Sequence, residues 1–234
     1  MDNQINEVTI VGGGTAGWLA AAFLVRFMNL RNEENPTKVT LIESPNVPTI
    51  GVGEATVPTM AALLKSLGIS EKEFFIRCNA SFKMGVRFTN WSHDEKGQAT
   101  SFIHPFEAIR TQLAGQNPAY HFHKYGGPPG RQGIDDCMSF SGAAIKRKLG
   151  PKFLTHGDYE TQLNYAYHLD AGKFAEFLRE ISIERGVNHV LDDVEEVEQD
   201  ERGFISALKL QRQGRRSVEL VIDCTGFKGV IINQ

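Results

Sequence analysis

The start of the chain alternates between apolar runs and polar breaks in the order strand, turn, helix, strand. The apolar, β-branched run "EVTIV" (7–11) is typical of a buried parallel strand. The stretch from Thr15 to about Met28 holds helix formers and no proline. After the polar break "RNEENPT", the run "KVTLIES" (38–44) predicts a second strand. The pattern therefore predicts a βαβ unit with a right-handed crossover.

Two short helices and one strand are expected next. The helices span 59–67 and 70–79, and Ser70 with Glu73 forms the capping-box pattern that opens the second one. In "ASFKMGVRFTNW" (80–91) apolar and polar residues alternate, which predicts one strand with a single core-facing side. The apolar side would carry Phe82, Met84, Val86 and Phe88, and the polar side Lys83, Gly85, Arg87 and Thr89.

The middle of the chain has weaker periodicity than its flanks. Residues 90–161 are rich in Gly, Pro, His and aromatic residues, which predicts loops and short elements that form a binding region. The pattern strengthens again at Asp170, which is expected to cap a helix running to Arg185. Gly186 follows as the residue that stops this helix.

Three runs near the end of the chain predict strands and are separated by the short breaks "ERG" and "QGRR". They cover 189–200, 204–212 and 217–226. Their spacing predicts an antiparallel meander whose last strand returns to the main sheet. With the βαβ start, this order predicts an α/β fold.

Composition narrows the class of partner. The chain has 234 residues, of which 41% are hydrophobic, and a formal charge of −3. It can therefore bury a proper core but has no basic field for nucleic acid or an anionic membrane surface. We expect a small-molecule partner, with no nucleic acid and no membrane; a homodimer is compatible with the sequence.

Cysteine usage and the N-terminus agree with a cytoplasmic protein. The three cysteines (Cys78, Cys137 and Cys224) form no C-x-x-C pair, so neither a zinc site nor a disulfide framework is predicted. The N-terminus "MDNQINE" is acidic, whereas a signal peptide needs a positive one. Glycines interrupt the apolar run that follows, which argues against a membrane span.

The glycines between the first strand and the first helix predict a dinucleotide site. In Gly12-x-Gly14-x-x-Gly17 the first glycine allows a tight turn, the second lets a pyrophosphate approach the backbone, and the third permits close helix packing. The phosphates would lie at the helix N-terminus. Glu43 ends the second strand, where a carboxylate could accept ribose hydroxyls. The alternatives are a turn without a ligand and a solvated glutamate.

The run 217–226, the last of the three predicted strands, favours FAD over NAD as the cofactor. It ends in Asp223-Cys224-Thr225-Gly226, which resembles the two-part flavoprotein class, where an Asp and a Gly return to the dinucleotide. The expected fold is thus an FAD/NAD(P)-binding, Rossmann-like two-part flavoprotein fold with an inserted substrate-binding region.

Five stretches in the same order resemble the flavin-dependent tryptophan halogenase family. They are "VGGGTAGW" (11–18), "IGVGEATVP" (50–58), "FKMGVRFTNW" (82–91), "HPF" (104–106) and "DCTGFKG" (223–229). The resemblance implies a halogenase that uses FADH2, O2 and chloride or bromide to make hypohalous acid. This oxidant would halogenate tryptophan, indole or a related aromatic. A separate flavin reductase would supply the FADH2.

The resemblance also assigns roles to single residues. Lys83 matches the family's catalytic lysine, and its placement on a strand with an apolar opposite side would favour the neutral amine that a haloamine route requires. His104, Pro105 and Phe106 match positions that line the indole pocket, with the proline fixing a turn. Glu107 stands where the family often has glycine, which alters the local loop.

The segment "GVGEAT" (51–56) resembles the family's strap between flavin and substrate sites, where glycines let the backbone pass close to the flavin ring. The residues expected to contact the cofactor are Gly12, Gly14, Thr15, Ala16, Gly17, Glu43, Ser44, Gly53, Ala55, Thr56, Val194, Asp223 and Gly226.

Three parts are expected along the chain. Residues 1–90 would hold the FAD-binding βαβ part with the strap and the lysine strand, 91–185 the substrate-binding insertion, and 186–234 the returning meander. Family members run to about twice this length by resemblance, so the fold is expected to be incomplete at its C-terminal side. Two alternatives stay open: an FAD-dependent monooxygenase and a truncated, non-catalytic FAD-binding remnant.

Overall fold

The computed structural model describes residues 5–28, 36–48, 52–107, 116–127 and 134–233. The chain divides into two compact units, each treated separately below. The first comprises Met1–Gly53, Ile76–Asn79 and Leu169–Gln234, and the second Glu54–Phe75 and Ala80–His168. These units follow other boundaries than the expected three-part division by role, which stays a prediction.

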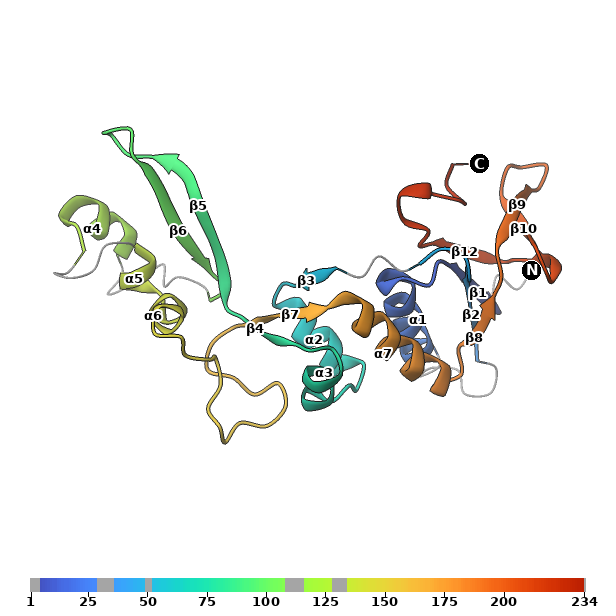
Figure 1. Cartoon of the computed structure of the whole chain (residues 1–234), viewed down its shortest axis with the longest axis horizontal. Helices are drawn as coiled ribbons and strands as arrows, with labels where there is room; N and C mark the ends of the chain where they lie inside the picture. The colour runs from blue at the N-terminus through green and yellow to red at the C-terminus, as the bar shows by residue number, and fades with distance from the viewer. Residues whose placement is uncertain (1–4, 29–35, 49–51, 108–115, 128–133, 234) are drawn as a thin grey trace. The chain divides into compact units, whose positions relative to one another are not determined.

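A four-stranded parallel sheet forms the centre of the first unit (Figure 1). Its strands, in spatial order, are β12 (Leu220–Asp223), β1 (Glu7–Val11), β2 (Lys38–Glu43) and β8 (Asn188–Leu191). Two helices of this unit, α1 (Thr15–Phe27) and α7 (Ala171–Glu184), pack against each other. The parallel pairing of β1 with β2 across α1 confirms the predicted strand–helix–strand order.

Local sequence signals set the ends of α7. The Asp170 carboxylate accepts a hydrogen bond from the Lys173 backbone N–H at 3.0 Å, as an N-cap should. Gly186 follows the helix with a φ of +97°, a left-handed conformation that glycine adopts without strain. Phe174, Phe177 and Leu178 face the core and are fully buried. The predicted helix and both of its end signals are confirmed.

The expected three-strand meander is wrong in its strand count. The run 189–200 divides into β8 and β9 (Val194–Gln199), the break "QGRR" forms most of a further strand, β11 (Gly214–Ser217), and the run 217–226 forms β12. Of the strands after α7, β9, β10 (Ile205–Leu210) and β11 form an antiparallel sheet, whereas β8 and β12 join the parallel one. The buried Asp192 carboxylate marks the first break, where it accepts backbone N–H groups of the turn that leads into β11. These hydrogen bonds compete with the regular pairing of a continuous strand at this point.

The second unit contains two small sheets. One has the order β3 (Gly53–Ala55), β7 (Ala166–Asp170) and β4 (Ser81–Lys83), and the other is the hairpin β5 (Gly85–His93) and β6 (Ala99–Pro105). Its helices are α2 (Thr59–Ser66), α3 (Glu71–Arg77), α4 (Pro118–Tyr125), α5 (Ile134–Met138) and α6 (Phe140–Lys146). The predicted helices over 59–67 and 70–79 are confirmed in shorter form, and the Glu73 backbone N–H donates to Ser70 Oγ at 3.4 Å.

The single strand predicted over 80–91 is wrong. The chain leaves one sheet and enters another at Met84: Lys83 pairs with Ala166 on β7, whereas Gly85 pairs with Pro105 on β6. A Cβ at Gly85 would lie 2.7 Å from the His104 carbonyl oxygen, so a side chain there would prevent this close pairing. The alternation of apolar residues continues through Met84, so it gave no sign that the partner strand changes from β7 to β6 there.

Residues 90–161 are also more regular than expected, because β5 and β6 form a hairpin there. Its turn carries a local signal: the Asp94 carboxylate accepts from the backbone N–H groups of Lys96 and Gln98 at 2.9 and 2.8 Å. Gly97 follows with a φ of +75°. The polar break "DEKG" (94–97), which ends in glycine, could have been recognised as the loop of a hairpin.

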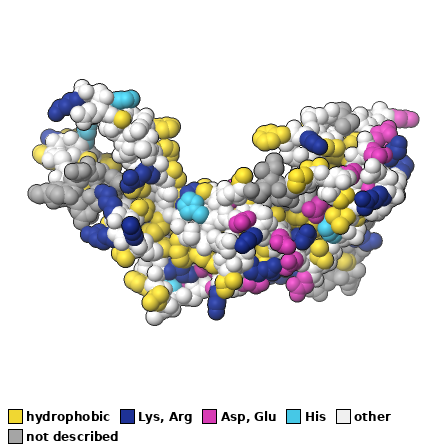
Figure 2. Space-filling model, viewed as in Figure 1, with side chains coloured by type: hydrophobic (Ala, Val, Ile, Leu, Met, Phe, Trp, Pro, Cys, Tyr) yellow, Lys and Arg dark blue, Asp and Glu magenta, His cyan; other side chains and the backbone are white. Residues whose placement is uncertain are grey.

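Figure 2 shows that most acidic side chains on the displayed face lie over the unit with the parallel sheet. Among the helices that the structure describes, none has the length and apolar character needed to cross a bilayer.

Candidate functional site

The glycine turn between β1 and α1 requires glycine at its first and third positions. Gly12 has a φ of +118°, and a Cβ there would lie 2.2 Å from the Cys224 carbonyl oxygen. A Cβ at Gly17 would lie 1.9 Å from the Gly12 carbonyl oxygen. At Gly14, by contrast, an added Cβ would meet no described heavy atom within 4 Å. The turn is thus closely packed against the backbone at Gly12 and Gly17 and open at Gly14.

The N-terminus of α1 presents unused donors at this open side. Gly14 is the N-cap residue, no side chain caps the helix, and its first turn holds no acidic residue. The first N–H groups of a helix have no intrahelical acceptor, and together with the helix dipole they favour an anion. Open space at Gly14 and an uncapped helix start are the features that a pyrophosphate group needs. The residues present therefore fit a dinucleotide such as FAD.

A cavity of about 380 Å³ lies at the carboxyl ends of the parallel strands, over this turn. Its lining brings together eight of the residues expected to contact a cofactor: Gly12, Gly14, Thr15, Ala16, Glu43, Ser44, Val194 and Gly226. The other five expected residues, Gly17, Gly53, Ala55, Thr56 and Asp223, are not among its described lining residues. Ligands of open α/β sheets bind at this edge of the sheet.

Sequence reasoning missed Asp192, Asp193 and Lys228, which also line this cavity. Asp193 holds the neighbouring loop through its carboxylate, which accepts hydrogen bonds from the Ser44 hydroxyl and the Asn46 amide. The signal was available, because both aspartates directly follow a parallel strand. The error in the meander placed them in the middle of a strand instead.

Glu43 is held by a histidine from the adjacent strand. His189 Nε2 lies 2.8 Å from Glu43 Oε2, and the two side chains are 16% and 18% exposed. The His189 ring packs edge-on against Trp18, with ring centroids 4.9 Å apart. A Cβ at Gly13 would lie 2.2 Å from the Glu43 Cδ atom, so the turn fits closely around the carboxylate. Glu43 is a positioned group and not a solvated strand end.

Asp223 organises the last loop and does not face the cavity. Its carboxylate accepts from the Thr225 hydroxyl at 2.6 Å and from the backbone N–H groups of Thr225, Ile231 and Ile232 at 2.9, 3.1 and 3.0 Å. Burial would raise the pKa of Asp223, but these donors outweigh it and hold the pKa below its ordinary value. Asp223 thereby folds the segment that brings Gly226 and Lys228 to the cavity.

The second unit holds Lys83 at the end of β4. Its Nζ donates to the Thr56 carbonyl oxygen at 2.8 Å and lies 5.3 Å from the centroid of the Phe106 ring. Thr56 is fixed by β7, because its N–H donates to the Tyr167 carbonyl at 2.9 Å and its hydroxyl accepts from the Tyr167 N–H at 3.0 Å. The strap residue Thr56 thus belongs to the lysine site in this structure.

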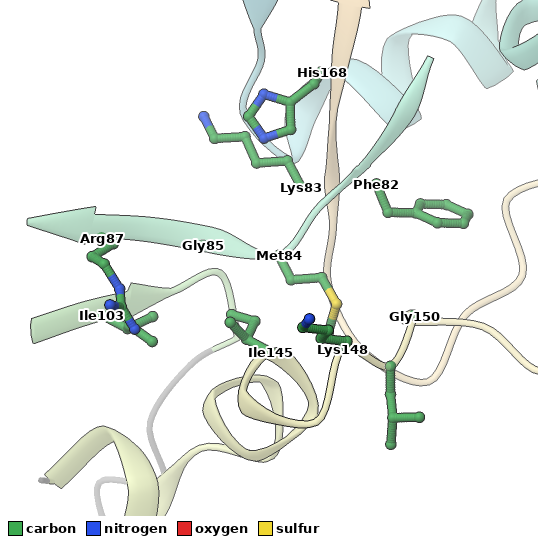
Figure 3. Close-up of a pocket in the computed structure, with 11 residues that line it drawn as sticks. Phe82, Lys83, Met84, Gly85, Arg87, Ile103, Ile145, Lys148, Gly150 and His168 are labelled. Carbon is green, nitrogen blue, oxygen red and sulfur yellow. The ribbon is translucent and has the colours of Figure 1, made fainter. Parts of the chain in front are cut away.

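Lys83 lines a cavity of about 430 Å³ within the second unit. Figure 3 shows its side chain beside that of His168, which projects from the adjacent strand β7. None of the three "HPF" residues is among the described lining residues. His104 is exposed opposite Val86, and the Phe106 N–H donates to the Met84 carbonyl at 3.1 Å. The turn expected at Pro105 is therefore wrong: His104 and Pro105 complete β6.

Comparison with known proteins assigns this arrangement to a family. The family model described as tryptophan halogenase matches residues 7–234. The chain belongs to the tryptophan halogenase family. It is 40% identical to the tryptophan 6-halogenase ThaL of Streptomyces albogriseolus and 34% identical to the tryptophan 7-halogenase RebH of Lentzea aerocolonigenes. Each alignment covers 100% of this chain and 45% of the relative, so the chain spans less than half of their length.

Solved structures of halogenases share the fold. The tryptophan 6-halogenase SttH of Streptomyces toxytricini matches with a TM-score of 0.85 at 38% identity, over 98% of this chain and 44% of that one. The flavin-dependent halogenase BrvH of Brevundimonas sp. BAL3 matches with a TM-score of 0.79 at 32% identity, over 98% and 44%. The resemblance and the fold class inferred from the sequence are confirmed.

Glu107, the departure from the tryptophan halogenase pattern after "HPF", has a structural role. Its carboxylate accepts hydrogen bonds from the Ser141 N–H at 2.9 Å, from the Ser141 hydroxyl at 2.7 Å and from the Phe140 N–H. Phe140 and Ser141 are the first two residues of α6. Glu107 therefore caps a helix that glycine could not cap.

Glu71 anchors the sheet that carries Lys83, although no sequence pattern pointed to it. It is 3% exposed and accepts from the Tyr167 hydroxyl at 2.8 Å, the Tyr159 N–H at 2.8 Å, the Tyr165 hydroxyl and the Lys152 ammonium. Burial would raise the pKa of Glu71, but these donors hold it below its ordinary value. A buried, ionised carboxylate thus holds Tyr167, the partner of Thr56.

Proposed function

We propose that this chain forms the FAD-binding and lysine-bearing part of a flavin-dependent halogenase. The enzyme would use FADH2, O2 and chloride or bromide to make hypohalous acid for electrophilic halogenation of tryptophan, indole or a related aromatic. The observation that carries the proposal is the position of Lys83. Its half-buried ammonium, held by a backbone carbonyl beside an aromatic ring, lines a cavity in a chain that belongs to the tryptophan halogenase family.

The glycine turn would bind the cofactor. The uncapped start of α1 and the open space at Gly14 would receive the pyrophosphate, and Glu43 would accept ribose hydroxyls. When bound, the reduced flavin supplies the two electrons that allow O2 to oxidise a halide ion. A separate flavin reductase would provide FADH2, and the protein would act in the cytoplasm.

Lys83 would deliver the oxidant to the substrate. Its Nζ can hydrogen-bond hypohalous acid or form a haloamine with it, and the Thr56 carbonyl would keep the nitrogen aimed into the cavity. His104 and Phe106 would contact the substrate from the end of β6 and beyond it. For Phe106, the ring beside Lys83 Nζ supports this role.

The whole chain is incubated with FAD, a flavin reductase, NADH, bromide and tryptophan or indole, and the products are analysed by mass spectrometry. A brominated product is expected, and Lys83→Ala should abolish it while the rate of FADH2 oxidation is unchanged. Lys148→Asn is the matched control, since Lys148 lines the same cavity and asparagine tolerates its φ of +55°.

The outcomes separate three functions. Oxygenated product in place of brominated product would indicate a monooxygenase. Stoichiometric FAD binding with neither product would indicate a non-catalytic FAD-binding protein. Equal bromination by the Lys83→Ala variant would overturn the role of the lysine.

A further inference from the structure

A second cavity of the first unit lies at the opposite edge of the parallel sheet. Its volume is about 570 Å³, and it shares no described lining residue with the cavity over the glycine turn. Glu7, Lys38 and Asn188 begin strands β1, β2 and β8, and all three line it. Arg185, just beyond α7, and Arg216 on β11 complete its charged lining.

Among the described lining residues of this cavity, Lys38, Arg185 and Arg216 carry positive charge and only Glu7 carries negative charge. Arg216 Nη2 donates to Glu7 Oε1 at 2.6 Å, and the Thr40 hydroxyl donates to the same oxygen at 2.6 Å. The Asn188 amide in turn donates to Thr40 Oγ1 at 3.2 Å. Glu7, the single carboxylate among the described lining residues, is therefore already engaged. Lys38 and Arg185 leave an excess of two positive charges.

Both guanidinium groups carry a buried N–H without a described acceptor. Arg185 Nη1 and Arg216 Nε are inaccessible to solvent and have no hydrogen-bond partner in the part of the chain that the structure describes. Burial and the nearby charge of Arg26 lower the pKa of Arg185, although Glu184 opposes this. An unpaired buried donor is costly, and a charged one more so. An anion bound in the cavity would lower the electrostatic cost of burying both guanidinium groups.

We propose that this cavity is an oxyanion site whose ligand carries a phosphate group or an equivalent dianion. Guanidinium groups bind such oxyanions through paired N–H donors, and the excess of two positive charges matches a dianion. The site does not depend on the halogenase proposal, because it shares no described lining residue with the cavity over the glycine turn or with the Lys83 cavity. Occupancy would stabilise the starts of three parallel strands.

The test is a calorimetric titration of the whole chain with inorganic phosphate, with sodium chloride at equal ionic strength as the reference. Wild type should bind phosphate saturably, and its melting temperature should rise with phosphate concentration. Arg185→Met should weaken phosphate binding at least tenfold. Arg202→Met is the matched control, because Arg202 lies in the exposed turn between β9 and β10 and should leave binding unchanged.

Arg185→Met also separates a binding role from a structural one. Since it removes a charge that is buried near another cation, its melting temperature without phosphate should be unchanged or higher. If that variant does not fold, Lys38→Met, at an exposed strand start, should weaken phosphate binding two- to fivefold. Equal responses to phosphate and chloride in wild type would overturn the proposal. So would full phosphate binding by Arg185→Met, which would show that the anion binds outside this cavity.

Discussion

The glycine turn and the lysine site are built in different ways. The glycines of the turn lie close together in sequence, and a side chain at Gly17 would collide with the Gly12 carbonyl, although Gly12 also packs against the distant Cys224. The lysine site is made by side chains and carbonyls from distant segments: Lys83 donates to Thr56, and Thr56 is held by Tyr167, 111 residues away. A locally built site is specified by a motif, whereas an assembled site depends on the whole unit.

The largest effect is expected from a side chain inside the glycine turn. Gly17→Ala should reduce FAD affinity by about 100-fold or more, because its Cβ would lie 1.9 Å from a carbonyl that cannot move without opening the turn. Fluorescence titration with FAD measures this. Gly14→Ala is the control for folding: its Cβ meets no described atom, so circular dichroism should be unchanged while cofactor affinity falls. Wild-type affinity in Gly17→Ala would show that the turn does not require glycine there.

The next largest effect is expected at Glu71, the buried carboxylate that holds Tyr167, the partner of Thr56. Glu71→Gln should lower the free energy of unfolding by about 3 kcal/mol, since it leaves the Lys152 ammonium without its buried partner. Urea denaturation measures the change, and Glu95→Gln in the exposed hairpin turn should have no effect. A loss below about 0.5 kcal/mol would mean that Glu71 does not anchor the sheet.

The pH dependence of stability follows from the same group. The folded pKa of Glu71 lies below its ordinary value, so its contribution is complete above the pH at which the unfolded carboxyl ionises. That contribution is lost as the pH falls through the folded pKa. Wild type should therefore lose more stability on acidification than Glu71→Gln does.

A smaller effect is expected at the carbonyl that holds the lysine. Thr56→Val keeps the size of the side chain but removes the hydroxyl that accepts the Tyr167 N–H at 3.0 Å. The carbonyl would shift, and with it the Lys83 nitrogen, so bromination should slow about tenfold with little change in substrate KM. Mass spectrometry of timed reactions measures the rate, and Thr59→Val at the start of α2 is the control. An unchanged bromination rate would show that the Thr56 hydroxyl does not help to position Lys83.

The smallest effect is expected at His189, which holds Glu43 beside the glycine turn. His189→Phe keeps a ring against Trp18 but removes the hydrogen bond to Glu43, so FAD affinity should fall about fivefold, which corresponds to about 1 kcal/mol. Fluorescence titration gives the affinity. In the Glu43→Gln background the His189 substitution should add little, because the two residues act through one contact. Full additivity would contradict a positioning role for His189.

The sequence was most informative where residues close along the chain decide the structure. The strand over 7–11, the helix from Thr15 and the helix capped by Asp170 were predicted and are present. It was least informative over 80–107, where alternation predicted one strand and the structure has three. Alternation reports which side of a strand is buried but not which strand is its partner.

By itself, the sequence determined the glycine turn, the helix that follows it and the family, because these depend on residue types at short, fixed spacings. The tertiary structure alone decided that Glu107 caps α6, that His189 holds Glu43 and that the Thr56 carbonyl holds Lys83. The first two contacts join residues 34 and 146 apart. Contacts over such separations form only when packing brings elements together. The pattern of apolar and polar residues along the chain therefore does not predict them.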